Sequence, residues 1–274
     1  MSIFDAIVQA IIQGLTEFLP VSSSGHLRLY QALTGQSVEE GTFLLVILHL
    51  GTLVAVFIAF WDTIWALIKE FFVLVKDVFT GKFKWSTMNA DRRMIIMLMI
   101  SLVLLVPFYL IKDIFENIGL PILALCFLYT SVILFFANRV KNNKKTAADM
   151  TVKDAVVIGL FQCVALFPGV SRSGSTISGA LFSGIDKETA VRYSFVLGIP
   201  AILGGCLSEL MDAMDGAFEV NVPAAAIGFV VSAIVGIAAI KLVKWLVKSD
   251  NFHIFSIYTL LVSLFTLGVW IFQK

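Results

Sequence analysis

The first part of this sequence that could carry out chemistry is a polar segment at residues 13–26. Gln13 and Glu17 are four residues apart, so they share a face if this segment is helical. A carboxylate at bilayer depth costs about 3 kcal/mol, so Glu17 requires a partner or a polar cavity. Ser23 and His26 are three residues apart and form a candidate nucleophile and base if the turn at Ser23 is already helical. The serines and glycine around them supply hydroxyls and backbone amides for an anion.

A second polar segment, at residues 168–176, places Arg172 among four hydroxyl residues and two glycines. A planar guanidinium with hydroxyl and amide groups around it suits a phosphate group. We therefore interpret the two segments together as one oxyanion site. Its catalytic candidates are Glu17, Ser23, His26 and Arg172. The candidate substrate-binding residues flank these in both segments: Gln13, Ser22, Ser24, Gly25, Ser171, Ser173, Gly174, Ser175 and Thr176.

The composition places most of the chain in a lipid environment. Of its 274 residues, 59% are hydrophobic and 14% are charged, which is too little charge to cover a soluble protein of this length. The net charge of +1 gives no indication of a nucleic-acid partner. The three cysteines are single residues in apolar stretches, so we expect them to pack and to form no disulfide framework.

Long apolar segments predict an all-α polytopic membrane protein with a single membrane domain over residues 1–274. Six segments are long and apolar enough to span a bilayer: about 42–61, 94–111, 119–137, 193–211, 222–247 and 253–272. Two shorter apolar segments, 3–19 and 155–167, each run into a proline and then into one of the polar segments. Interrupted segments of this kind are typical of re-entrant helices around a buried site.

The two polar segments are related by an internal repeat. Residues 21–25, Val-Ser-Ser-Ser-Gly, match residues 170–174, Val-Ser-Arg-Ser-Gly, at four of five positions, and a proline closely precedes each run. The offset of 149 residues also relates His49-Leu50-Gly51 to Gly198-Ile199-Pro200. We therefore predict two repeats, about 1–137 and 154–274, joined by a basic loop at 138–153.

The distribution of positive charge predicts the orientation of the chain. Segments 62–93 and 138–153 are rich in Lys and Arg, whereas 212–221 contains three acidic residues and neither Lys nor Arg. The positive-inside rule places the two basic segments in the cytoplasm and 212–221 outside. Six spans threaded through these loops put both termini outside and make the second repeat inverted. The two polar segments then enter from opposite faces and meet near the midplane.

Two runs of residues carry a resemblance to a known family. Residues 17–26, Glu-Phe-Leu-Pro-Val-Ser-Ser-Ser-Gly-His, and 168–176, Pro-Gly-Val-Ser-Arg-Ser-Gly-Ser-Thr, closely resemble the signature motifs of the undecaprenyl-pyrophosphate phosphatases, also called bacitracin-resistance proteins. The resemblance covers essentially the whole chain. It implies hydrolysis of undecaprenyl diphosphate to undecaprenyl phosphate and phosphate, which recycles the carrier lipid for peptidoglycan synthesis and gives bacitracin resistance. It also implies a multi-pass protein of the bacterial cell membrane, a homodimer, and an active site open to the outer face.

The resemblance also assigns roles to residues and suggests a metal. The family's acidic motif falls on Gln13 and Glu17, its serine and histidine on Ser23 and His26, and its arginine motif on Ser171, Arg172 and Thr176. Family members carry either Glu or Gln at the position of Gln13, so Gln13 here puts a site with two carboxylates in doubt. A carboxylate facing a diphosphate is repulsive unless a cation bridges them, so Glu17 predicts Mg²⁺ or Ca²⁺.

Several alternatives stay open at the level of the sequence. The attacking group is Ser23 with His26 as base, His26 itself, or water that His26 activates. A lipid flippase or transporter for an anionic substrate is the alternative function, since an inverted repeat with a midplane site serves transport equally well. The phosphatidic-acid type of membrane phosphatase is excluded because it requires a histidine several residues after the arginine, which is absent after Arg172. His49 and His253 are expected to be structural.

Overall fold

The computed structural model of the chain describes residues 2–35, 42–111, 118–141, 143–214, 221–249 and 251–273. These residues form helices and connecting turns, and among them the one β-bridge is an isolated pair, Lys145 with Ile185. The prediction of an all-α protein is confirmed for this part of the chain. The predicted outer loop, 212–221, lies mostly outside the described residues.

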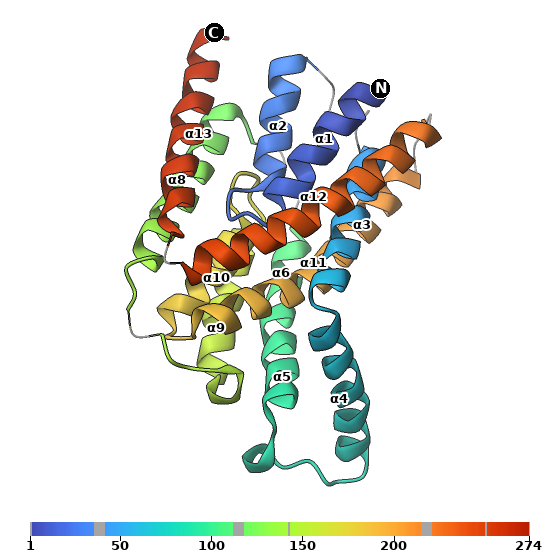
Figure 1. Cartoon of the computed structure of the whole chain (residues 1–274), viewed down its shortest axis with the longest axis vertical. Helices are drawn as coiled ribbons and strands as arrows, with labels where there is room; N and C mark the ends of the chain where they lie inside the picture. The colour runs from blue at the N-terminus through green and yellow to red at the C-terminus, as the bar shows by residue number, and fades with distance from the viewer. Residues whose placement is uncertain are drawn as a thin grey trace.

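The helices follow the order of the two predicted halves (Figure 1). The first half contains α1 (Ile3–Thr16), α2 (Ser23–Thr34), α3 (Thr42–Ala59), α4 (Trp61–Phe79), α5 (Ala90–Val103), α6 (Leu105–Tyr109) and α8 (Leu120–Ala137). The second half contains α9 (Val152–Val164), α10 (Arg172–Phe182), α11 (Lys187–Met214), α12 (Val222–Lys248) and α13 (His253–Phe272). The chain ends lie near the same end of the molecule, and α4 and α5 extend at the opposite end (Figure 1).

Fewer helices than expected are long and apolar enough to cross a membrane. Among the described residues there are four, in α8, α11, α12 and α13, and a fifth if α3 and α4 count as one span bent by 86°. The multi-pass prediction is therefore confirmed, but the arrangement of six spans with two re-entrant segments is not. The expected span 94–111 is divided, because α5 ends at Val103 and α6 begins at Leu105. Pro107 explains the break, since it cannot donate to the Val103 carbonyl and its ring crowds that carbonyl.

The segment 62–93 is largely helical, so its interpretation as a loop was wrong. Helix α4 continues to Phe79 and α5 starts at Ala90, which leaves a short connection between two antiparallel arms. Arg92 joins the arms, with Nε 2.6 Å from Glu70 and Nη1 2.8 Å from Asp77. Lys69 and Lys76, two of the basic residues in this segment, belong to α4, which is amphipathic.

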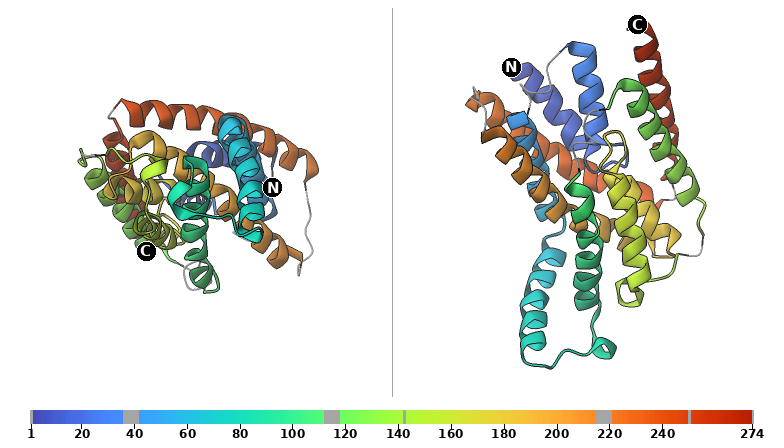
Figure 2. Two further views of the ribbon diagram at one scale, coloured as in Figure 1. Left: turned by 90° about the horizontal axis from the view of Figure 1, so that it is seen from below. Right: turned by 180° about the vertical axis from the view of Figure 1, so that it is seen from behind.

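Helix starts in the two halves follow the predicted offset of 149 residues. Helices α1 and α9 begin at Ile3 and Val152, and α2 and α10 begin at Ser23 and Arg172. Each short helix packs on the opposite half, α1 on α12 and α9 on α5. Figure 2 shows a further pairing across the halves, in which α13 lies along α8. These features agree with a duplication, while the inversion of the two halves across the membrane stays a prediction.

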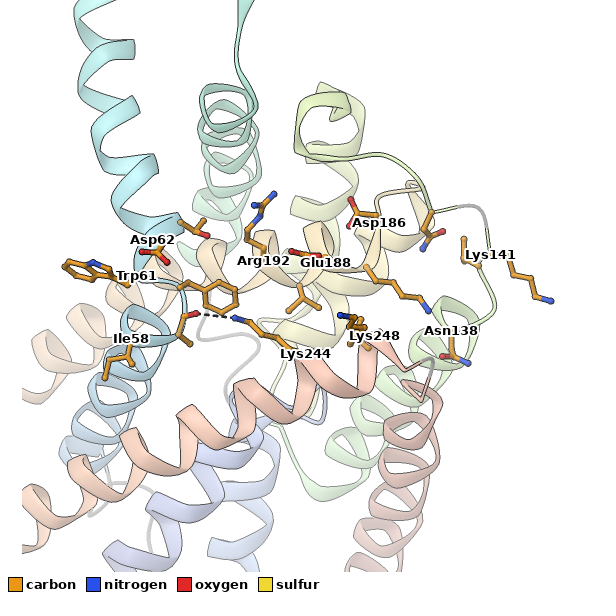
Figure 3. A pocket seen from close by; sticks show the side chains of 18 residues that line it. Ile58, Trp61, Asp62, Asn138, Lys141, Asp186, Glu188, Arg192, Lys244 and Lys248 are labelled. Carbon is orange, nitrogen blue, oxygen red and sulfur yellow. Dashed lines mark hydrogen bonds between the residues drawn. The ribbon is translucent and has the colours of Figure 1, made fainter.

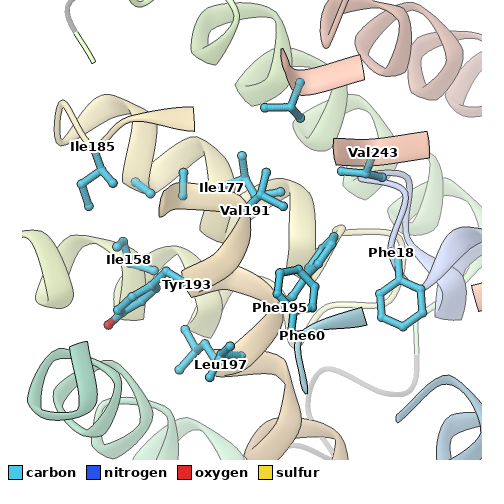
Figure 4. Packing of buried hydrophobic residues seen from close by; sticks show 14 of the residues in the cluster. Phe18, Phe60, Ile158, Ile177, Ile185, Val191, Tyr193, Phe195, Leu197 and Val243 are labelled. Carbon is cyan, nitrogen blue, oxygen red and sulfur yellow. The ribbon is translucent and has the colours of Figure 1, made fainter. Parts of the chain in front are cut away.

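The apolar core lies directly beside the polar segments (Figure 4). Phe18, which follows Glu17, is fully buried, and its ring meets Phe195 edge-on with centroids 5.5 Å apart. Phe195 also packs edge-on against Phe60, with centroids 5.6 Å apart. Because interiors are close-packed, these rings fix the neighbouring Glu17 and Ser194 and so hold two walls of the polar region in place.

Candidate functional site

The two predicted polar segments are in direct contact. Each one ends in a helix whose N-cap is a serine: Ser22 Oγ accepts from the Gly25 N–H at 3.3 Å, and Ser171 Oγ accepts from the Gly174 N–H at 3.0 Å. Ser22 Oγ also accepts from the Gly169 N–H at 3.1 Å, which ties the first segment to the second. The contact is close enough that a Cβ at Gly25 would collide with the Gly169 Cα.

Glu17 is the centre of the polar cluster. It is 9% exposed, and its Oε1 lies 2.6 Å from Arg172 Nη2 in an ion pair between the two halves. Its Oε2 accepts from Ser23 Oγ at 2.7 Å and from Gln13 Nε2 at 3.0 Å. Four residues predicted from the two segments are therefore in direct contact. The partner that a buried carboxylate requires is Arg172.

Arg172 is positioned by residues that the sequence did not single out. Its Nη1 donates to the Ser194 carbonyl at 3.4 Å. A Cβ at Gly198 would overlap the guanidinium, so the absence of a side chain there makes room for Arg172. Thr176, a predicted site residue, shares a hydrogen bond of 2.6 Å with the Ser194 hydroxyl. For Ser194 and Gly198, the one signal in the sequence was the repeat match that included Gly198.

His26 lies apart from Ser23 and does not pair with it. Its Nδ1 is 2.7 Å from the Ser22 carbonyl, and its Nε2 is 2.9 Å from the Tyr258 hydroxyl. A carbonyl can only accept, so Nδ1 carries the hydrogen and Nε2 accepts from Tyr258. The ring also stacks on Tyr258 and meets Phe127 edge-on. The three-residue spacing would allow Ser23 and His26 to pair on one helix face. In the structure the imidazole instead contacts the Ser22 carbonyl at the helix start, and the Ser23 hydroxyl contacts Glu17.

His49 is the imidazole that the structure places beside Glu17. Its Nε2 is 3.9 Å from Glu17 Oε2, and its Nδ1 is 2.8 Å from the Leu45 carbonyl. The Leu45 carbonyl requires a hydrogen on Nδ1, and this contact directs Nε2 toward the cluster. This residue was expected to be structural, and the signal that could have found it is the repeat offset that pairs it with Gly198.

The other predicted binding residues divide into two groups. Ser22, Ser24 and Ser171 line the cavity described next. Ser173, Gly174, Ser175 and Thr176 are not among its lining residues and belong to the first turns of α10, where all four are buried. Ser173 Oγ donates to the Leu19 carbonyl at 3.3 Å, which joins this helix to the end of the first segment. Ser173 and Thr176 therefore help to hold this segment in place, whereas Ser175 Oγ has no hydrogen-bond partner among the described residues.

A cavity of about 210 Å³ lies beside the polar cluster, and Glu17, Ser23 and Arg172 of the cluster line it. Its walls include Glu17, Ser23, His49 and Arg172 together with Leu105 and Gln162. A larger cavity of about 990 Å³ lies elsewhere, between the α3–α4 bend, the start of α11 and the end of α12 (Figure 3). None of the predicted site residues lines this larger cavity. The smaller cavity is therefore the candidate active site, because chemistry depends on the groups present and less on volume.

The residues around Glu17 do not form a metal cage by themselves. Among the described residues, no group of three or more His, Cys, Asp or Glu side chains could hold a metal ion. Both Glu17 oxygens are already engaged by Arg172, Ser23 and Gln13. Gln13 Oε1, however, is buried and has no hydrogen-bond partner in this part of the chain. The donor set therefore fits a hard cation only where substrate oxygens complete its coordination, as is usual for Mg²⁺ at phosphates.

Comparisons with known proteins agree with the motifs. The profile of the family described as bacitracin resistance protein BacA matches residues 6–265. The chain is 40% identical over 266 residues to the undecaprenyl-diphosphatase of Alkaliphilus metalliredigens, covering 94% of this chain and 95% of that protein. It is 37% identical over 275 residues to the undecaprenyl-diphosphatase of Methanosphaera stadtmanae, covering 97% and 98%. A relative named undecaprenyl-diphosphatase 4 from Bacillus cereus is 37% identical over 261 residues, covering 94% and 93%. The chain belongs to the bacitracin resistance protein BacA family.

Proposed function

We infer that this protein is an integral-membrane undecaprenyl-diphosphatase, which hydrolyses undecaprenyl diphosphate to undecaprenyl phosphate and phosphate. The names of its relatives support this activity, and so does the resemblance of both motifs. The single structural observation that carries it is the Glu17–Ser23–Arg172 cluster, which two distant segments build inside one cavity. In contact, a hydroxyl, a carboxylate and a guanidinium can supply the nucleophile, the base and the positive charge for phosphoryl transfer.

We propose that Ser23 attacks the terminal phosphorus and that Glu17 accepts its proton. The support is the hydrogen bond of 2.7 Å from Ser23 Oγ to Glu17 Oε2. A bond forms between Ser23 Oγ and the terminal phosphorus, and the bond from that phosphorus to the bridging oxygen breaks, so that undecaprenyl phosphate leaves. Water then hydrolyses the phosphoserine and releases phosphate. A water molecule positioned by Glu17 could replace Ser23 as the attacking group with the same overall balance.

Arg172 is the proposed clamp for the transferring phosphoryl group. Its guanidinium is paired with Glu17 before substrate arrives, so a diphosphate must compete with this carboxylate for the same donors. The planar fork can bind two oxygens and stabilises the charge that develops during transfer. His26 supports this geometry from outside the cavity, because its Nδ1–H donates to the Ser22 carbonyl at the bend of the first segment.

A divalent cation, Mg²⁺ or Ca²⁺, is proposed as the cofactor. Glu17 and Gln13 Oε1 would hold it together with diphosphate oxygens, which fits the incomplete set of protein ligands. When bound, such an ion neutralises phosphate charge and polarises the phosphoryl oxygens. We propose no protein cage for it.

The location of the site in the membrane is also part of the proposal. The Lys and Arg distribution supports a cytoplasmic location for the basic segments 62–93 and 138–153. We keep both termini outside, and inverted halves whose polar segments meet near the midplane, as part of the proposal. The substrate is a lipid, so the protein acts in the bacterial cell membrane, with its site open to the outer face. A homodimer is proposed on the resemblance alone. The alternative function, a lipid flippase or transporter, is favoured only by the repeat offset of the helices.

Phosphate release by the purified protein in detergent tests the proposal. A phosphatase needs no second compartment, whereas a carrier without hydrolytic activity releases no phosphate from undecaprenyl diphosphate. Glu17→Ala, Ser23→Ala and Arg172→Ala should each lose most activity, while His253→Ala, at the exposed start of α13, should be unaffected. Absence of phosphate release by well-folded wild-type protein, with Mg²⁺ or Ca²⁺ present, would favour the carrier.

A further inference from the structure

Gln162 is a buried polar residue that neither motif includes. It lies on α9, is 2% exposed, and lines the same cavity as Glu17, Ser23 and Arg172. Neither its Oε1 nor its Nε2 has a hydrogen-bond partner among the described residues. A buried amide without partners is unfavourable because it has lost its hydrogen bonds to water. A residue of this kind beside a reaction cavity therefore requires an explanation.

The internal repeat shows what Gln162 lacks. Gln162 is 149 residues after Gln13, and both occupy equivalent places on α1 and α9. The starts of these helices are built alike, since Ser2 accepts from the Asp5 N–H and Thr151 accepts from the Asp154 N–H. The Gln13 amide, however, donates to Glu17, and the residue equivalent to Glu17 in the second half is Leu166. Gln162 thus presents the same amide without the carboxylate.

The group that replaces this carboxylate must accept hydrogen bonds from an amide N–H. A phosphate oxygen is such an acceptor, and the established substrate of the relatives brings a diphosphate. The cavity also needs further donors, because Glu17 already pairs with Arg172 and offsets its positive charge. An amide donor adds a hydrogen bond to a charged oxygen with no change in the charge of the site.

We propose that Gln162 is a substrate-binding residue whose side-chain amide donates to a phosphate oxygen of the diphosphate. Gln162 would donate to the phosphate in the second half as Gln13 donates to Glu17 in the first half. This inference rests on the proposed function, since it requires the diphosphate to occupy the cavity that contains Glu17 and Arg172. A structural role is the competing account, in which the amide only supports packing of α9 against α5 and α6.

The test compares Gln162→Met, which keeps the length of the side chain, with Gln162→Glu and with Ser178→Ala. Ser178 is a matched control, because its hydroxyl is also buried without a partner in the described structure but lies outside the cavity lining. The measurements are kcat and KM for undecaprenyl diphosphate, the inhibition constant of inorganic phosphate, and the Tm with and without phosphate.

For Gln162→Met we expect about a tenfold higher KM and weaker phosphate inhibition, with an unchanged or higher Tm without ligand. Gln162→Glu should bind substrate more weakly still, because it adds a negative charge facing the diphosphate. Ser178→Ala should match the wild type in KM. The proposal is overturned if Gln162→Met keeps a normal KM and normal phosphate inhibition, or if its only change is a lower Tm. Arg172→Ala distinguishes a failure of the proposed function from a failure of this inference. If Arg172→Ala stays active, the proposed active site is wrong. If Arg172→Ala is inactive while Gln162→Met behaves like the wild type, only the role of Gln162 is refuted.

Discussion

The space that Gly198 leaves for Arg172 gives the sharpest test of the site. A methyl group at residue 198 would overlap Nη1, Cζ and Nη2 of Arg172. Carbon and nitrogen atoms settle at about 3.5 Å, so the guanidinium of Gly198→Ala must shift by about 1 Å or more. The bond of 2.6 Å to Glu17 does not survive such a shift with good geometry.

The expected result is a large loss of activity with a small loss of stability. One charge-assisted hydrogen bond contributes about 1.5–3 kcal/mol, which corresponds to about a 10- to 100-fold lower kcat/KM. A misplacement of about 1 Å in a positioned group gives a comparable estimate. The cost to folding is smaller, because the displaced atoms are the far end of a flexible side chain in contact with a cavity.

The assay is phosphate release from undecaprenyl diphosphate in detergent, together with a thermal unfolding curve. Gly204→Ala is the matched control on the same helix, because a Cβ there meets no atom within 4 Å. We expect Gly204→Ala to retain the wild-type rate. Wild-type turnover in Gly198→Ala would refute the proposal that the Arg172 guanidinium binds the phosphoryl group. A large fall in the Tm of that variant would show that its loss of activity results from misfolding.

Three further predictions concern the metal, the second imidazole and the topology. Excess EDTA should abolish hydrolysis and added Mg²⁺ or Ca²⁺ should restore it, with Glu17→Gln requiring more metal; a full wild-type rate in EDTA contradicts the bridging cation. His49→Gln should keep much of the activity, whereas the activity of His49→Leu should fall about tenfold. The reason is that Glu17 already accepts the Ser23 hydrogen bond, so residue 49 needs only to supply a polar contact. An equal loss of activity in both variants would instead indicate acid–base catalysis by the imidazole. Single cysteines at Asn143 and at Gly216, which lies outside the described residues, should react with an impermeant reagent from opposite faces of the membrane in a background without the native cysteines; labelling of both from one face would contradict the inverted repeat.

The sequence alone identified the residues that meet in the polar cluster, Gln13, Glu17, Ser23 and Arg172, and the lipid environment around them. Apolar length and low charge required membrane helices, and two proline-interrupted segments placed polar groups where lipid makes them costly. The offset of 149 residues indicated a duplication, and α2 and α10 do begin 149 residues apart, at Ser23 and Arg172. These conclusions could be reached because hydropathy, helix spacing and repetition are properties of neighbouring residues.

Only the tertiary structure decided which of those residues meet. Helical spacing favoured Ser23 with His26, but the Ser23 hydroxyl donates to Glu17, and the imidazole near that carboxylate is His49. The ion pair of Glu17 with Arg172 joins residues 155 positions apart, and no periodicity in either segment encodes it. Such contacts depend on how the packed helices are oriented relative to one another. The side-chain rotamer then decides which neighbouring group each residue contacts. Gln162 was not singled out from the sequence because its neighbours on α9 are mostly apolar, although its offset of 149 residues from Gln13 could be read there. Only the structure showed that it lines one cavity with Glu17 and Arg172.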